Sequence, residues 1–318
     1  MTATRATESL RDAYGKALAE LGEHDPSVVA VDEEPAGPMG TPWFRQRFPE
    51  RFFHAERPGT TIISTAAGLA KDGRTVFAST LAGTAAGSAY PSVRESVCYP
   101  RANVKIVALH RGPPAEGDGP AYQMFEDLGL MRGLPGMTVV VPSDAATTRA
   151  AVTELAGQAG PSYVRLSTGE LPIVTDGAFR IGRAGELRAG NDLTMVAVGA
   201  LVSRALDVAE ELAKVGVTTR VLDFASLKPF DEAALLRAAR DTGAVLTLEE
   251  HSVLTGLGAM VAATTSENYP VPVRRVGVPD VFVEPDPSWA ATLDRYGMSL
   301  ERIRDEAWEL LRLRGKVQ

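Results

Sequence analysis

Short apolar runs alternate with amphipathic segments along almost the whole chain. The runs are rich in valine, isoleucine and leucine and nearly unbroken, as in strands that are covered on both faces of a parallel sheet. The expected strands are Ser27–Val31, Arg74–Ser79, Val104–Leu109, Thr138–Val141, Ser162–Leu166, Leu193–Val198, Thr218–Val221, Ala244–Leu248 and Val273–Val278. The expected helices are Ser9–Leu21, Thr60–Leu69, Asp144–Ala156, Val202–Val215, Asp231–Arg240, Gly256–Ser266 and Ser299–Leu313. Strands that alternate with helices in this way predict an α/β fold with mostly parallel sheets.

Five of the predicted helices begin at residues that commonly precede a first turn. The side chains of Asp144, Ser203, Asp231 and Ser299 can each accept a hydrogen bond from a free backbone N–H group of that turn. Gly256 could open the remaining helix of the five, Gly256–Ser266. We therefore expect these five positions to be N-caps.

One segment interrupts the alternation of strands and helices. Thr168–Asn191 contains six glycines or prolines in 24 residues and no long helical pattern. A chain of 318 residues is long enough for about two domains. We expect two consecutive α/β domains, residues 1–172 and residues 190–318, joined by a linker over residues 173–189.

Composition narrows the classes to which the protein can belong. The single cysteine, Cys98, excludes an internal disulfide, and only four histidines argue against a histidine-rich metal centre. A net charge of −7 indicates no basic surface for nucleic acid. The sequence has no apolar run of about 18 residues and no secretory signal pattern at its start. We therefore expect a cytoplasmic protein that binds neither nucleic acid nor membrane.

Two segments could carry chemistry because each follows a predicted strand. His54 ends a short strand in the segment 51–73, and His110 follows the strand Val104–Leu109. Open parallel sheets bind ligands at the carboxyl ends of their strands. The alternative interpretations are a packed helix in the first segment and a glycine- and proline-rich connection, around Gly117-Asp118-Gly119-Pro120, in the second.

A third segment places Glu249, Glu250 and His251 together at the end of a strand. Such a run is compatible with a metal site or an acid–base site. Because adjacent residues of a strand point to opposite faces, the three side chains cannot all bind one ion. We therefore expect a structural or interface role for this run.

Taken together, these segments resemble the C-terminal half of transketolase. The match includes RFFHAERPGTTIISTAAGLA at 51–70, SVRESVCYPRANVKIVALH at 92–110 and EGDGPAYQMFEDLGLMRGLPGMTVVVPSDA at 116–145. It continues with GPSYVRLS at 160–167, LDFASLKPFD at 222–231, TGAVLTLEEHSVLTGLGAMV at 242–261 and VRRVGVPDVF at 273–282. The resemblance implies a pyrimidine-binding domain followed by the transketolase C-terminal domain.

The same resemblance implies a cofactor and a partner chain. Transketolases use thiamine diphosphate, and an upstream domain holds its diphosphate and Mg²⁺ through a GDG motif that a later asparagine completes. Here Gly117-Asp118-Gly119 has no asparagine after it until Asn191, so the resemblance implies no metal ligand in this chain. We expect the N-terminal-half transketolase subunit to hold the diphosphate and Mg²⁺ in an α2β2 heterotetramer that acts on a sugar or aldehyde.

One position departs from the family pattern at the cofactor. In transketolases a glutamate protonates the pyrimidine ring of thiamine diphosphate, and the motif places it nine residues before the position of Gly68. That position is Gly59, which has no proton to donate. The nearest carboxylate is Glu56, three residues earlier, which could replace the glutamate only if the loop between them refolded.

Further departures lie where the substrate is expected. Tyr122 replaces a histidine of the family pattern, and Thr168 replaces an arginine that binds sugar phosphate. Near the expected ring-stacking phenylalanine the chain has Leu81 or Thr80, and Tyr90 is the nearest aromatic candidate. The resemblance implies Glu56 and His110 as catalytic residues, Gly59, Leu81, Tyr90 and Glu56 as cofactor-binding residues, and His54, His110, Asp118, Tyr122 and Thr168 as substrate-binding residues.

We expect the chain to be one subunit of a split transketolase that transfers a two-carbon ketol unit between a ketose and an aldehyde, with an atypical substrate. Two alternatives stay open. A non-catalytic or regulatory transketolase-like subunit would explain the absent glutamate. The β subunit of a 2-oxoacid dehydrogenase shares both domains, although DGPAYQMFEDLGLMRGLPGM and SLKPFD are closer to transketolase.

Overall fold

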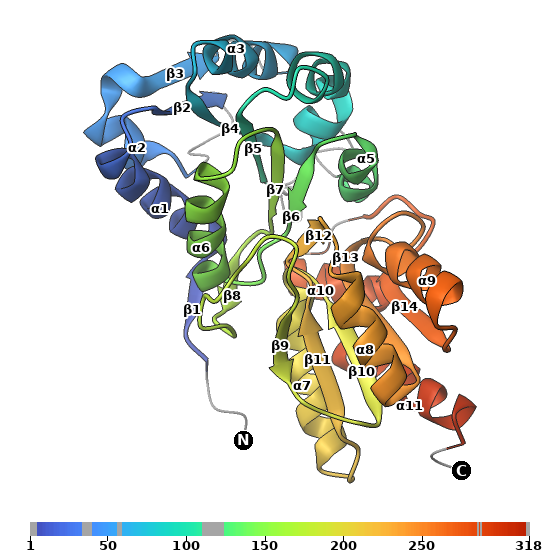
Figure 1. Cartoon of the computed structure of the whole chain (residues 1–318). Helices are drawn as coiled ribbons and strands as arrows, with labels where there is room; N and C mark the ends of the chain where they lie inside the picture. Colours follow the sequence, from blue (N-terminus) through green and yellow to red (C-terminus); the bar gives the residue numbers. More distant parts are fainter. Residues whose placement is uncertain are drawn as a thin grey trace.

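The structure is a computed structural model that describes residues 5–33, 40–55, 59–109, 124–284, 286 and 288–315. It consists of two stacked α/β units, the first built on a seven-stranded sheet and the second on a five-stranded sheet (Figure 1). The predicted class, two consecutive α/β units with mostly parallel sheets, is confirmed. Among the residues described, no helix is both long enough and apolar enough to cross a membrane.

The seven-stranded sheet has the order β12-β6-β7-β5-β4-β2-β3. Every neighbouring pair is parallel except β12 and β6. All residues of β4 and β7 are buried, which explains the nearly unbroken apolar runs in the sequence. The strands are β2 Val28–Glu33, β3 Phe52–Ala55, β4 Thr75–Leu81, β5 Val104–Leu109, β6 Thr138–Val140, β7 Ser162–Leu166 and β12 Ser226–Lys228.

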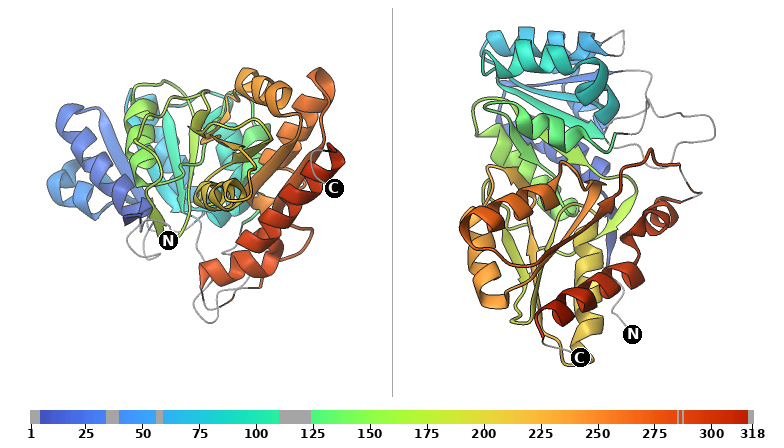
Figure 2. Two further views of the ribbon diagram at one scale, coloured as in Figure 1. Left: turned by 90° about the horizontal axis from the view of Figure 1, so that it is seen from below. Right: turned by 90° about the vertical axis from the view of Figure 1, so that its right-hand side faces the viewer.

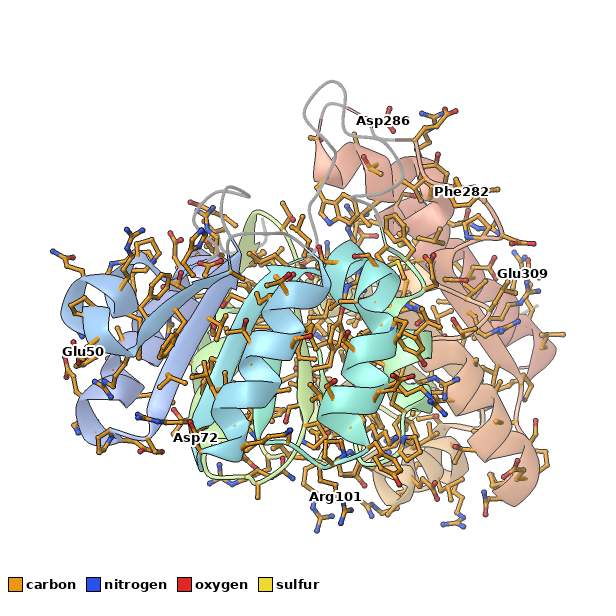
Figure 3. The ribbon with its side chains drawn as sticks, turned by 90° about the horizontal axis from the view of Figure 1, so that it is seen from above. Glu50, Asp72, Arg101, Phe282, Asp286 and Glu309 are labelled. Carbon is orange, nitrogen blue, oxygen red and sulfur yellow. The ribbon has the colours of Figure 1, made fainter. Side chains whose placement is uncertain are left out.

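Helices cover both faces of this sheet. On one face α1 (Leu10–His24) packs against α6 (Ala145–Ala156). On the other face α3 (Thr60–Lys71) lies beside the π-helical turn η3 (Val93–Cys98), as Figure 3 shows. The shorter elements of this unit are α2 Pro42–Arg47, η1 Pro49–Arg51, η2 Gly83–Ser88, α4 Tyr90–Ser92 and α5 Asp127–Gly133.

The five-stranded sheet has the order β14-β13-β10-β11-β9, in which only β9 is antiparallel to its neighbour. Its strands are β9 Gly185–Arg188, β10 Leu193–Ala197, β11 Thr219–Asp223, β13 Val245–Ser252 and β14 Val273–Val278. The helix α11 (Leu300–Leu313) packs against α7 (Leu201–Ala213), and α8 (Glu232–Thr242) packs against α9 (Leu257–Asn268) (Figure 2). The remaining elements are α10 Trp289–Leu293, η5 Asp294–Met298 and the antiparallel pair of β1 Thr7–Ser9 with β8 Glu170–Pro172.

Four of the five predicted N-caps are confirmed. Asp144, Asp231 and Ser299 each accept a hydrogen bond from a backbone N–H three residues later, and Gly256 precedes α9. The prediction for Ser203 is wrong, because α7 begins earlier, after Ala200. The Ser203 hydroxyl lies in the first turn and donates to the Ala200 carbonyl oxygen instead.

Two short antiparallel strands are absent from the predicted set. β12 comes from the second half of the chain, yet it pairs with β6 of the seven-stranded sheet. β9 lies within the segment predicted as the linker, and it pairs with β11 of the five-stranded sheet. Each has only three or four residues, too few for a clear periodicity.

A buried group of charged side chains joins the two units. Arg165 of β7 is 1% exposed and donates to the backbone carbonyl oxygen of Glu250 in β13 at 2.7 Å. Its guanidinium nitrogens also lie 3.6 Å from the carboxylates of Asp127 and Glu250. Asp127 accepts from the Tyr163 hydroxyl, and Glu250 accepts from the Ser167 hydroxyl, both at 2.7 Å. One cation therefore neutralises carboxylates from both units.

Replacing this cation should destabilise the whole chain. Arg165→Met keeps the side-chain length but leaves two buried carboxylates without their cation, which should cost about 3–5 kcal/mol of unfolding free energy. The exposed Arg237 of α8 is the matched control, and Arg237→Met should change stability by less than about 0.5 kcal/mol. Urea denaturation measures both. Equal stability of the two variants would contradict the role given to Arg165.

Candidate functional site

The carboxyl ends of five parallel strands meet along one edge of the seven-stranded sheet. Their order is β7-β5-β4-β2-β3. The chain leads from β2 outward to β3, whereas it leads from β4 in the opposite direction to β5. Such a reversal between adjacent strands opens the crevice in which α/β sheets bind ligands. The edge around β2 and β4 is therefore the candidate site.

Three residues predicted from the sequence lie along this edge. His54 is the exposed third residue of β3, Leu81 is the buried last residue of β4, and Thr168 is the partly buried second residue after β7. Leu81 pairs in register with Leu109, the last residue of β5. Glu56, His110, Asp118 and Tyr122 lie outside the described residues, and their roles stay predictions.

Tyr90 belongs to the helical layer beside the sheet. It begins the short helix α4, and its ring is partly buried. Its hydroxyl donates to the Leu130 carbonyl oxygen in α5, at 3.5 Å. This contact ties Tyr90 to α5, and its part in cofactor binding stays a prediction.

Gly59 lies at the N-cap of α3 in a backbone conformation that favours glycine. Its φ is +100° and its ψ is −131°. The nearest atom to a Cβ at this position would be the Ser88 Oγ, at 3.6 Å, so the space would admit a side chain. The backbone would not, because residues with a Cβ rarely adopt this φ. Position 59 is therefore unfavourable for glutamate because of its backbone conformation and not because of crowding.

A buried polar group near the same edge has no counterpart among the predicted residues. Asp32 of β2 is 4% exposed and accepts a hydrogen bond from the Thr41 hydroxyl. Its register partners are His54 on β3 and Ser79 on β4. The Ser79 hydroxyl lies 2.7 Å from that of Tyr14, and burial raises the pKa of Tyr14 well above its usual value. A carboxylate near the end of an apolar strand is the sequence signal that could have identified Asp32.

The run Glu249-Glu250-His251 has a structural and interface role, as predicted. The Glu249 carboxylate accepts hydrogen bonds from Leu257 N at 2.6 Å and Gly258 N at 2.8 Å, at the start of α9. A Cβ at Gly256 would collide with this carboxylate, so the close approach requires glycine there. Burial raises the pKa of Glu249 to about 7.

His251 links β13 to α5 as a neutral imidazole. Its Nε2 accepts a hydrogen bond from the backbone N–H of Leu128 at 3.1 Å, and its Nδ1 lies 3.0 Å from the Ser252 carbonyl oxygen. Burial lowers the pKa of His251 to about 4, although the Asp127 carboxylate acts in the opposite direction. The proton therefore resides on Nδ1, and Nε2 stays free to accept.

Two family models match the chain in sequence order. The transketolase pyrimidine binding domain matches residues 7–174, and the transketolase C-terminal domain matches residues 182–303. The chain therefore belongs to the transketolase family. All strands of the seven-stranded sheet except β12 lie within the first match, and all strands of the five-stranded sheet lie within the second.

Relatives of similar length are described as separate parts of transketolases. The chain is 37% identical over 280 residues to a putative transketolase C-terminal section from Methanocaldococcus jannaschii, covering 86% of this chain and 88% of that protein. It is 40% identical to the 6-deoxy-6-sulfo-D-fructose transketolase subunit SqwH from Clostridium sp., covering 86% of each. It is 34% identical to an apulose-4-phosphate transketolase subunit from Phocaeicola vulgatus, covering 95% of this chain and 97% of that protein.

Two solved structures are similar to this chain. One described as "Split gene transketolase, inactive beta4 tetramer" is 44% identical, with a TM-score of 0.90, and covers 96% of this chain and 99% of that chain. The transketolase from Campylobacter jejuni shares the fold, with a TM-score of 0.79 at 19% identity. This chain spans 47% of the Campylobacter chain.

The residue at position 59 does not suit the proton donor to thiamine diphosphate that the motif spacing predicts there. Transketolases depend on this cofactor, and the motif spacing predicts their glutamate at position 59. Gly59 offers neither a carboxylate nor a backbone conformation suited to a residue with one. We therefore assign no proton transfer to position 59.

In the described ranges, no group of three or more histidine, cysteine, aspartate or glutamate side chains could hold a metal ion.

A pair of glycines in the same helical segment tests the backbone argument at position 59. Gly59→Ala should destabilise the chain by about 1–3 kcal/mol, because alanine is strained at this φ. Gly68→Ala should stabilise it by up to about 1 kcal/mol, because Gly68 is an exposed residue inside α3 with nothing within 4 Å of its Cβ position. Urea midpoints of the two variants measure the contrast. Similar effects of the two changes would show that position 59 is not restricted to glycine.

The lowered pKa of His251 predicts a pH-dependent contribution to stability. Between the usual value of 6.5 and about 4, the unfolded chain binds a proton that the folded chain does not. The contribution of His251 is therefore complete above pH 6.5 and is lost as the pH falls toward 4. The difference in unfolding free energy between the wild type and His251→Gln should therefore shrink as the pH falls through this range. Urea denaturation at several pH values measures this difference. A difference that is independent of pH would contradict the neutral, buried imidazole.

Proposed function

We propose that the protein is the C-terminal-half subunit of a split transketolase. It would take part in transferring a two-carbon ketol unit from a ketose donor to an aldehyde acceptor. The observation that carries this proposal is the similarity to the split-gene transketolase chain, which extends over 96% of this chain and 99% of that one. This similarity, at 44% identity, favours a transketolase subunit of that kind.

The proposed function implies a partner chain. It spans about half of a complete transketolase such as the Campylobacter enzyme. We propose that an N-terminal-half subunit supplies the other half and holds the diphosphate of thiamine diphosphate together with Mg²⁺. The relative described as an inactive beta4 tetramer supports the view that such a subunit needs its partner for activity. Two copies of each chain, α2β2, are the proposed assembly.

The substrate would approach the carboxyl ends of the parallel strands. Thr168 lies there, beside Ser167, whose hydroxyl is held by Glu250. A threonine hydroxyl can hydrogen-bond a sugar hydroxyl, but it cannot form the ion pair that an arginine forms with phosphate. The relatives from Clostridium and Phocaeicola are described with different substrates, which supports a substrate specific to this chain.

Gly59 favours a second candidate function. A subunit whose pyrimidine-side position lacks the family's carboxylate could regulate or stabilise a complex without carrying out its chemistry. In this alternative, the chain retains the fold and its partner-binding surface, and another chain performs the transfer. Assembly and turnover measured separately distinguish the two candidates.

The test combines the purified chain with the N-terminal-half transketolase subunit from the same organism. Sedimentation should give a complex with equal numbers of both chains. Ketol transfer should require both chains, thiamine diphosphate and Mg²⁺, in a panel that includes 6-deoxy-6-sulfo-D-fructose, apulose 4-phosphate and unphosphorylated aldehydes. A complex without turnover would favour the non-catalytic subunit. Absence of any complex would overturn the proposal of a split transketolase subunit.

A further inference from the structure

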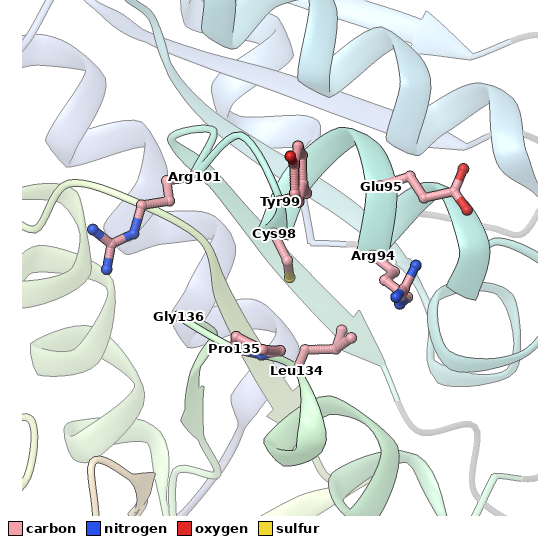
Figure 4. A pocket seen from close by; sticks show the side chains of 8 residues that line it. All are labelled: Arg94, Glu95, Cys98, Tyr99, Arg101, Leu134, Pro135 and Gly136. Atoms are coloured by element: carbon pink, nitrogen blue, oxygen red, sulfur yellow. The ribbon is translucent and has the colours of Figure 1, made fainter.

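A cavity of about 450 Å³ lies on the first unit, away from the carboxyl edge. It lies between the end of η3 and the turn Leu134–Gly136 (Figure 4). The chain leads from η3 into the amino end of β5, and from this turn into the amino end of β6. The cavity therefore opens at the amino edge of the sheet, opposite the candidate site. Its volume is within the range of pockets that bind small molecules.

The floor of this cavity is apolar. Leu134 and Pro135 form one side, and the side chain of Cys98 points toward them from the other (Figure 4). Cys98 is 5% exposed, and burial raises the pKa of its thiol to about 11. The thiol is therefore neutral at physiological pH and contributes a small polarisable surface. Such a floor suits an uncharged, hydrocarbon part of a ligand.

The rim of the cavity carries an excess of positive charge. Arg94 and Arg101 both line it, and among the described residues neither guanidinium has a hydrogen-bond or ion-pair partner. Glu95 is the acidic residue in the lining. Lys228 adds a further cation behind the wall, where its Nζ donates to the Leu134 carbonyl oxygen at 2.6 Å. The two arginines flank the cavity on opposite sides (Figure 4), so they give its opening a positive electrostatic potential that favours an anion.

Arg101 occupies a backbone position that would suit glycine better. Its φ is +57°, a positive value rare for residues other than glycine, and its N–H donates to the Cys98 carbonyl oxygen at the end of the helical segment. The local turn explains this backbone conformation, but it does not explain why the residue in it is an arginine. Arg101→Gly is therefore a variant that removes the guanidinium while it suits the existing backbone.

We propose that this cavity is a binding site for a small amphipathic anion. The apolar part of the ligand would lie over Cys98 and Leu134, and its carboxylate, sulfonate or phosphate would lie at the rim beside Arg101, with Arg94 on the opposite side of the cavity (Figure 4). The exposed ring of Tyr99, which is 90% accessible at the mouth, could cover an aromatic ligand. The site is separate from the candidate transferase site and does not depend on the proposed function.

Cys98 provides a direct reporter because it is the only cysteine of the chain. The probe is 2-naphthoate, and its uncharged control is 2-naphthamide. With the full chain, saturating 2-naphthoate should slow the reaction of Cys98 with N-ethylmaleimide at least about tenfold, because it would cover the thiol. The amide should bind about tenfold more weakly, because it lacks the charge-assisted hydrogen bonds. Isothermal titration calorimetry measures the same affinities without relying on the thiol.

Two arginine variants complete the test. Arg101→Gly should weaken 2-naphthoate binding about tenfold, whereas Arg237→Ala, a change of an exposed arginine on α8, should leave it unchanged. Urea denaturation checks that both variants are folded, and Arg94→Gln replaces Arg101→Gly if that variant is not. No saturable binding at millimolar 2-naphthoate would overturn the proposal. Equal binding of the acid and the amide, or equal affinity of the wild type and the rim variant, would overturn it as well.

Discussion

The pairing of Arg165 with carboxylates from both units is the interaction on which the rest of the structure depends. A buried carboxylate is strongly unfavourable unless a cation and hydrogen-bond donors compensate for the lost water. Asp127 begins α5 in the first unit and Glu250 lies on β13 in the second, and both face Arg165. Neither unit therefore completes this cluster by itself. Separation of the two sheets would leave a charged side chain on each side without its partner.

This constraint also fixes the elements around the candidate site. Arg165 lies two residues before Ser167, which follows β7, so the cluster holds the carboxyl end of that strand. The other carboxylate of the cluster belongs to Asp127, the first residue of α5. The next two backbone N–H groups of this helix donate hydrogen bonds to the imidazole of His251. The five-stranded unit thus positions the edge at which the seven-stranded unit presents its strand ends. A partner chain would meet an edge whose geometry is set by both units.

Much of the fold could be predicted because long buried strands leave a clear apolar signal. Val104–Leu109, Ser162–Leu166 and Val273–Val278 agree with the structure to the residue. β9 and β12 could not be predicted, because three or four residues carry no periodicity and their pairing depends on distant strands. Ser203 shows the limit of cap rules, since a serine within the first turn of a helix has the same sequence signal as one at its start.

The candidate site was only partly predictable, because several of its features depend on the tertiary structure. The strand ends could be predicted from the sequence, and the motif spacing predicted the family's glutamate at position 59. The positive φ that disfavours a glutamate there could not be predicted. Arg165 looks like one polar residue in an apolar strand, and only the tertiary structure shows its partners. The cavity at Cys98 arises from two segments far apart in sequence.

Hydrogen–deuterium exchange of the chain, alone and with the proposed N-terminal-half partner, tests most directly whether the carboxyl edge is the surface that a partner subunit completes. Binding of the partner should slow exchange in α3, which follows Gly59, and at the carboxyl ends of β4 and β7. The amino edge near Arg101 and Gly136 should exchange at the same rate in both states. Protection confined to other surfaces, with no change at the carboxyl edge, would contradict a subunit that shares its site with a partner.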